Sequence, residues 1–262
     1  MPVAALLART SDRREGTTRG AEAIARALDP AATLLGTPAP PRTQGWEADL
    51  RDSREALALA GRFVADALDA GRAPVLTAGH CSICMATLPE VVARRPGVMI
   101  LWIDAHGDFN TPETTPSGFL GGMCLAAACN RWDSGWPGTV DPETVVMSGV
   151  RDLDAGERVV VEDARVGTAP PDAVAGALRG KQVFVHLDLD VLDNAVLPAQ
   201  FEAPGGLQPD ELRAMLAALA EAAEIVGVEI TAYEAPDDTA GAERLTGILA
   251  GVIRPLLAGA AT

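Results

Sequence analysis

The stretch 98–110, Val-Met-Ile-Leu-Trp-Ile-Asp-Ala-His-Gly-Asp-Phe-Asn, joins an apolar run to a cluster of polar groups. Residues 98–103 are all apolar, as in a strand that is covered on both faces of a parallel sheet. Asp104, His106 and Asp108 follow at alternate positions, so in an extended segment their side chains point the same way. Such carboxylate and imidazole groups together suit manganese, iron or zinc.

A second stretch has the same pattern. Residues 182–190 read Gln-Val-Phe-Val-His-Leu-Asp-Leu-Asp, and Asp188 and Asp190 extend from the end of the apolar run. Buried carboxylates are costly unless they are paired or bind a cation. Two strand ends of this kind can hold two metal ions. His186 lies deeper on the same face, where packing or a hydrogen bond to a ligand carboxylate is favoured over direct ligation.

Outward from these stretches, apolar runs alternate with amphipathic stretches of helical length. The predicted strands are Val3–Ala8, Ala32–Leu35, Pro74–Ala78, Val98–Ile103, Thr144–Val150, Arg165–Thr168, Gln182–Leu189 and Glu224–Ala232. The predicted helices are Thr18–Leu28, Arg51–Ala70, Ser82–Arg94, Phe119–Ala128, Asp172–Arg179, Pro209–Ala223 and Ala242–Leu257. This alternation predicts one three-layer α/β/α domain over residues 1–262, with a mostly parallel sheet of about eight strands. In such a sheet, ligands bind beyond the carboxyl ends of the strands.

Two further predicted strands end in polar residues. His80 and Cys81 follow the run 74–78, and one of the two is expected to reach the same pocket. Glu234 follows the run 224–232. It is either an anchor for a cationic substrate or a loop acid in water.

Composition restricts the partners and the compartment. The 262 residues include 21 Lys and Arg against 36 Asp and Glu, a formal charge of −15, which argues against binding to nucleic acid or to an anionic membrane. The apolar runs are far shorter than the ~20 residues of a membrane span. No basic region precedes the short apolar stretch near the start, so we expect a cytoplasmic protein. The four cysteines therefore predict packed thiols or ligands in place of disulfides.

Five sets of residues, in matching order along the chain, resemble motifs of the ureohydrolases, the arginase and agmatinase family. Ile103–Gly118 is similar to D-A-H-x-D-x-N-T-P…S-G, and His186–Asp193 is similar to D-x-D-x-x-D-P, with Asn194 in place of the proline. Val150–Glu157 is similar to G-x-R-D-x-D-P-x-E, Arg19–Ile24 to G-P-x-A-I-R, and Tyr233-Glu234 to V-E-V-x-P. The resemblance covers nearly the whole chain.

The resemblance implies a centre of two manganese ions whose bridging hydroxide attacks a guanidinium carbon. Carried over residue by residue, it implies that Asp104 and Asp188 bridge the ions, that Asp108 binds one of them, and that His106 and Asp190 bind the other. It further implies that Glu234 holds the guanidinium and that the rest of the substrate is contacted by Asn110, Ser117 and Asp154. A trimer or hexamer is the assembly that it implies.

Besides Asn194, the chain departs from the family pattern at four positions that the family uses for metal, substrate or proton transfer. The family's G-G-D-H-S reads Ala78-Gly-His-Cys-Ser82, so Cys81 stands at the position of a histidine ligand and His80 at that of the preceding aspartate. Compared with an imidazole ligand, a thiolate at Cys81 favours zinc or iron over manganese. Phe119 replaces a substrate-binding asparagine, and Gly121 replaces a histidine that shuttles protons. We therefore expect slow turnover of simple guanidines unless His80 has taken over protonation, and a bulkier or less polar guanidino or amidino substrate in place of L-arginine.

These features predict a metal-dependent hydrolase of a C–N bond in a small guanidino-type molecule, which releases urea when the substrate is a guanidine. The predicted catalytic residues are Asp104, His106, His80 and Glu234. Two alternatives stay open at this point. One is a metal-binding member of the family that has lost hydrolase activity, and the other is a hydrolase of a formimino group or an amide.

Overall fold

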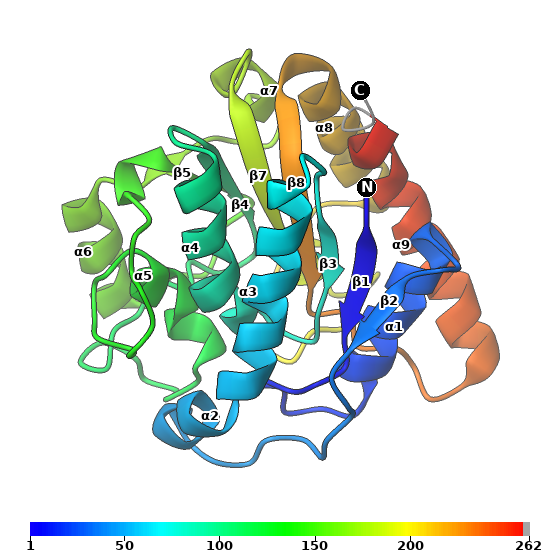
Figure 1. Cartoon of the computed structure of the whole chain (residues 1–262), viewed down its shortest axis with the longest axis horizontal. Helices are drawn as coiled ribbons and strands as arrows, with labels where there is room; N and C mark the ends of the chain where they lie inside the picture. Colours follow the sequence, from blue (N-terminus) through cyan, green and yellow to red (C-terminus); the bar gives the residue numbers. More distant parts are fainter. Residues whose placement is uncertain (259–262) are drawn as a thin grey trace.

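In the computed structural model, which describes residues 1–258, all eight predicted strands form one parallel sheet (Figure 1). The strands are β1 (Val3–Leu6), β2 (Thr33–Leu35), β3 (Val75–Thr77), β4 (Met99–Ile103), β5 (Val145–Ser148), β6 (Gly167–Thr168), β7 (Gln182–Asp188) and β8 (Glu224–Thr231). Their order across the sheet is β2-β1-β3-β8-β7-β4-β5-β6. Apart from their first residues, the central strands β4, β7 and β8 are buried and rich in Val, Ile and Leu, which is why they need cover on both faces.

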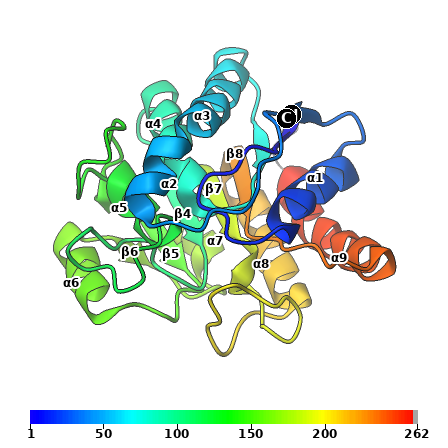
Figure 2. The same ribbon diagram turned by 90° about the horizontal axis from the view of Figure 1, so that it is seen from below.

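Helices on both sides of the sheet confirm the three-layer prediction. The helices are α1 (Gly16–Leu28), α2 (Trp46–Asp52), α3 (Arg54–Asp69), α4 (Cys84–Arg94), α5 (Cys124–Ala128), α6 (Ala155–Ala164), α7 (Val174–Ala177), α8 (Pro209–Ala222) and α9 (Thr239–Ala258). Helices α3, α4 and α5 pack on one face, and α1, α8 and α9 pack on the other (Figure 2). None of the helices in residues 1–258 combines the length and apolarity that crossing a membrane requires.

Three of the predicted helices differ in the structure. The predicted helix Arg51–Ala70 is interrupted at Ser53: its first two residues end α2, which begins at Trp46, and the rest forms α3. The hydroxyl of Ser53 donates to the Leu50 carbonyl (3.3 Å) and so competes with the helical backbone. In the range Phe119–Ala128, a 3-10 turn at Gly121–Met123 precedes α5, because the glycine pair is a poor helix start. In the range Asp172–Arg179, only α7 is helical.

Helix α6 was not among the predicted helices. It begins after Asp154, which forms a capping box with Glu157: each side chain accepts from the other residue's backbone N–H. This D-x-x-E pattern is a start signal that the sequence does carry.

The strand order brings distant parts of the sequence to one edge of the sheet. Strands β3 and β4 follow each other in the chain but are separated in the sheet by β8 and β7. The carboxyl ends of all strands face downward in Figure 1 and toward the viewer in Figure 2. Ile103 of β4 pairs with Leu187 of β7, so the residues that follow, Asp104 and Asp188, leave the sheet side by side.

Candidate active site

A pocket of about 180 Å³ opens at the carboxyl ends of β3, β4 and β7. Its lining includes many acids and, among the described residues, neither Lys nor Arg. The acidic residues of the lining are Asp104, Asp108, Asp152, Asp154, Glu157, Asp188 and Asp190. Buried carboxylates gathered without Lys or Arg need a bound cation or protons to balance their charge, so the pocket has the electrostatics of a cation site.

Asp104, His106 and Asp190 form one group of potential ligands, with ligand atoms within 4.8 Å of one another. Nδ1 of His106 lies 3.1 Å from Oδ2 of Asp190 and 3.5 Å from Oδ1 of Asp104. Both carboxylates are held in place by donors: Trp102 Nε1–H donates to Asp104 (3.1 Å), and the Ala105 backbone N–H donates to Asp190 (3.1 Å).

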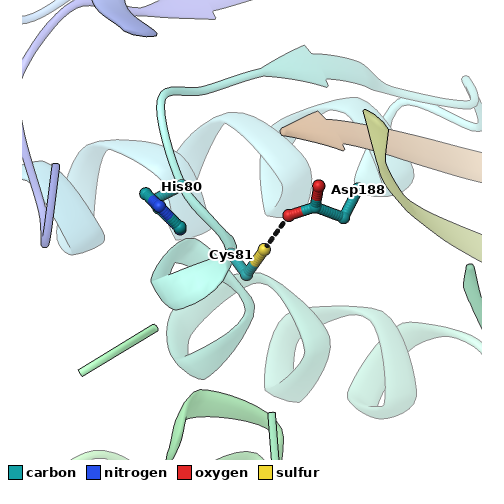
Figure 3. Close-up of side chains that lie close together, drawn as sticks. All are labelled: His80, Cys81 and Asp188. Carbon is teal, nitrogen blue, oxygen red and sulfur yellow. Dashed lines mark hydrogen bonds between the residues drawn. The ribbon is translucent and has the colours of Figure 1, made fainter. Parts of the chain in front are cut away.

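His80, Cys81 and Asp188 form a second such group (Figure 3). The thiol of Cys81, 1% exposed, donates to Oδ2 of Asp188 (2.7 Å) and lies 3.3 Å from the hydroxyl of Thr231. Burial raises the pKa of this thiol well above its usual value, and the neighbouring aspartates raise it further. The thiol is therefore protonated until a cation displaces its proton.

Asp108 reaches the pocket through an unusual backbone. Its φ of 50° lies in the left-handed region, which Asp tolerates better than most residues. The following segment is fixed by Glu157, whose carboxylate accepts the backbone N–H of Phe109 (2.7 Å). Asp108 is nearly buried, and Cys124 Sγ lies 3.7 Å from its Oδ2.

The carboxylates repel one another in this buried setting. Burial raises the pKa of Asp108 and Asp188 well above the usual range, and the charges of neighbouring aspartates add to the effect. The same causes raise the pKa of Asp104 to about 6. Burial, opposed by two backbone N–H donors, raises the pKa of Glu157 to about 7. In the absence of a cation, protons must neutralise part of this charge.

His106 is the exception to the negative field. Burial alone lowers its pKa, but hydrogen bonds and charges from Asp104 and Asp190 outweigh burial and raise it to about 12. Burial likewise acts to raise the pKa of Asp190, yet the bond to His106 lowers it. The imidazolium proton thus lies between carboxylates where a metal ion would lie. Oxygen, nitrogen and sulfur donors converging on this negative cavity fit divalent transition metals.

The predicted substrate contacts divide into two sets. Asn110, Ser117 and Asp154 line the pocket, and Asn110 Nδ2–H donates to Asp154 Oδ2 (3.0 Å). Glu234 lies outside this lining: its carboxylate is 3.4 Å from an Arg14 guanidinium nitrogen, and it borders a smaller neighbouring cavity.

Aromatic rings form one wall of the pocket. The ring of Phe119 lies 4.7 Å from that of His80 and 4.9 Å from that of Phe201, between centroids, and the guanidinium of Arg13 stands 5.4 Å from the Phe119 centroid. Nδ1 of the nearly buried His80 has no hydrogen-bond partner within residues 1–258. Burial lowers the pKa of His80, so its ring is neutral near pH 7.

The Phe119 ring also fills the space beside Gly121. A Cβ added at Gly121 would lie 2.4 Å from Cε1 of Phe119. The two departures from the family pattern are therefore neighbours in space, because the Phe119 ring fills space that a side chain at position 121 would enter.

Sequence reasoning missed five residues of the lining, of which Pro116 and Gly122 are small or apolar and three carry acidic or aromatic side chains. Asp152 and Glu157 belong to the quoted motif 150–157, and the capping box identifies Glu157. Phe201 comes from the loop between β7 and α8, where no local pattern distinguishes it.

Comparisons with known proteins agree with this geometry. The model of the arginase family matches residues 3–256. An Nω-hydroxy-L-arginine amidinohydrolase from Streptomyces lavendulae is 37% identical, over 97% of this chain and 96% of the relative. An arginase from Bacillus caldovelox is 34% identical over 67% of both chains. The crystal structure of an arginase from Bacillus cereus superposes with a TM-score of 0.80 at 25% identity, covering 97% of both chains.

Proposed function

Since the chain belongs to the arginase family and is thus a metal-dependent hydrolase of guanidino C–N bonds, we propose that its substrate is Nω-hydroxy-L-arginine. In this reaction water adds its oxygen to the guanidino carbon, and the bond from that carbon to the side-chain nitrogen breaks. The nitrogen takes a proton, and the products are L-ornithine and hydroxyurea. The observation that carries the proposal is the similarity to the Streptomyces hydrolase, which extends over nearly the whole of both chains.

The metal ions would be held by the residues that converge on the pocket floor. They are Cys81, Asp104, His106, Asp108, Asp188 and Asp190, all of which line the pocket, and Asp104 and Asp188 are the two that would be shared between the ions. Bound metal supplies an activated water at neutral pH and polarises the group under attack. We propose two ions and name manganese, with zinc or iron favoured to the extent that Cys81 binds as thiolate.

Three polar residues of the pocket lining suit the amino-acid part of the substrate. The carboxylate of Asp154 can accept from an α-ammonium group, and the hydroxyl of Ser117 and the amide of Asn110 can donate to an α-carboxylate. These contacts would orient the substrate with its guanidino group toward the metal ligands.

The reacting end favours a less basic group than guanidinium. Glu234 is paired with Arg14 outside the pocket, so it is not arranged to neutralise a guanidinium there. An N-hydroxyl group withdraws electron density and lowers the basicity of the guanidine, so the molecule can react in its neutral form. Such a substrate relies less on a proton shuttle, for which Gly121 offers no side chain. His80, held neutral beside the pocket, is the group we propose for proton transfer.

The test is a comparison of kcat/KM for Nω-hydroxy-L-arginine, L-arginine and agmatine, with hydroxyurea and urea quantified separately. We expect the hydroxylated substrate to be preferred by at least about tenfold, which corresponds to about 1.4 kcal/mol of transition-state stabilisation. Equal or greater efficiency with L-arginine would contradict the proposed substrate. Hydrolysis of none of the three with any divalent metal would contradict the catalytic proposal.

We also propose that the chain acts as one domain in a homotrimer or homohexamer in the cytoplasm. All four cysteines are free thiols, as expected in a reducing compartment. Size-exclusion chromatography with light scattering would measure the assembly directly.

A further inference from the structure

His186 lies one residue layer beneath the floor of the pocket. Its backbone on β7 pairs with Trp102 of β4 on one side and with Glu229 of β8 on the other. The side chains of His186 and Glu229 are both fully buried. A histidine and a glutamate this deep in a sheet need a reason, because burying polar groups is costly unless their bonds are satisfied.

The contacts of the ring determine its tautomer. Nδ1 of His186 lies 2.6 Å from Oε1 of Glu229, and the hydroxyl of Thr87 donates to Oε2 of the same carboxylate (2.5 Å). The imidazole stacks on Trp102, with 3.6 Å between centroids and 2° between planes. An Nδ1–H that donates to the glutamate leaves Nε2 as a lone pair.

That lone pair is unused by the protein. Within residues 1–258, Nε2 of His186 has no hydrogen-bond partner. An unsatisfied buried polar atom of this kind costs about 1–3 kcal/mol. A potential ligand nitrogen of His186 nevertheless lies within 4.8 Å of the sulfur of Cys81 and of a carboxylate oxygen of Asp104. Since Nδ1 is engaged by Glu229, Nε2 is the nitrogen left for an ion at this position.

We propose that His186 is a metal ligand of this chain, which together with Cys81 and Asp104 binds one ion through sulfur, nitrogen and oxygen. Glu229 acts as a positioning residue that fixes the ring, as carboxylates do behind many metal-bound histidines. A thiolate, an imidazole and a carboxylate together suit zinc, cobalt or ferrous iron better than manganese. This proposal rests on the proposed metal site but not on the substrate. Metal analysis and spectroscopy in the absence of substrate test ligation by His186, so a failure of that ligation is distinguishable from a failure of the proposed substrate.

The first experiment uses the unmodified protein. Its three histidines, selectively labelled with ¹⁵N, give ring spectra that variants of His80 and His106 assign. On addition of zinc to the metal-free protein, we expect the Nε2 resonance of His186 to move to the position of a metal-bound nitrogen, with Nδ1 still protonated. An unchanged His186 spectrum, while that of His106 moves, would overturn the proposal.

The second experiment measures the zinc affinity of variants with near-isosteric changes in this buried network. His186→Gln should lower zinc affinity at this position and change the visible spectrum of the cobalt-loaded protein. Glu229→Gln should weaken zinc binding by about 10–100-fold, as loss of such supporting carboxylates typically does. Thr87→Val is the matched control, since it disturbs the same buried network without touching the ring. Similar losses in Thr87→Val and His186→Gln would indicate general destabilisation and contradict ligation.

Discussion

Replacing Asp104 by Asn should make the metal-free protein more stable at pH 8, although Asp104 is a predicted bridging ligand. Asp104 is 1% exposed, and burial together with the charge of Asp190 raises its pKa from 3.8 to about 6. Each pKa unit corresponds to about 1.36 kcal/mol, so ionised Asp104 destabilises the metal-free fold by about 3 kcal/mol.

The sign follows from proton linkage. The folded state binds the Asp104 proton more tightly than the unfolded state, so this contribution to stability is complete below pH ~4 and is lost as the pH rises past about 6. Asn carries no charge at any of these pH values. It keeps one of the two acceptor positions used by Trp102 and the backbone of His106, and losing the other costs about 1 kcal/mol.

We therefore expect Asp104→Asn to gain about 2 kcal/mol at pH 8, which corresponds to a rise in Tm of roughly 4–8 °C for a chain of this size. At pH 4 or below the gain should vanish, because Asp104 is then protonated in the folded protein and only the hydrogen-bond loss remains. The assay is thermal unfolding followed by circular dichroism after dialysis against a chelator, with Asp193→Asn as a half-buried control outside the pocket lining. Addition of metal should reverse the order, since only the wild type is then stabilised. Equal destabilisation of the variant at both pH values would refute this reasoning.

Three further outcomes are expected. Metal analysis after reloading with manganese should give close to two ions per chain. Asp188→Asn should lose metal and activity together, whereas Asp193→Asn should keep both. Equal metal content and activity in the two variants would mean that the ligand set is misassigned. In competitive loading with manganese and zinc, Cys81→His should bind a larger share of manganese than the wild type, and bound metal should protect wild-type Cys81 from alkylation. Equal rates of alkylation with and without metal would exclude Cys81 as a ligand. His80→Ala should lower turnover by about 10²–10⁴-fold if His80 is the proton-transfer group, with metal content unchanged; loss of metal instead would make His80 a ligand.

The sheet could be predicted because its strands are apolar runs whose period and length are local properties of the sequence. The aspartates at the ends of β4 and β7 could be predicted for the same reason, since parallel strands place their carboxyl ends at one edge. Helix α6 could also have been predicted, because its capping box is local, but its first residues overlap the motif at 150–157 and its apolar positions give no clear helical pattern.

Other features depend on contacts between distant segments. Ala232, which follows β8, has a φ of 62°, and the chain turns there so that Tyr233 is buried while Glu234 points to Arg14. An alanine gives no signal for a left-handed residue. The orientation of the His186 ring likewise depends on Trp102 and Glu229, so alternation along one strand could indicate its face but not its free nitrogen.

The contact between Phe119 and Gly121 constrains the order in which this pocket can change during evolution. The Phe119 ring is packed against His80, Phe201 and Arg13, so it has little room to move aside for a side chain at position 121. A histidine introduced there alone would meet the ring, whereas a smaller residue at 119 first would open the space. A histidine at position 121 is therefore epistatic on position 119. The residue at position 119 must become smaller before a histidine at position 121 can be accommodated.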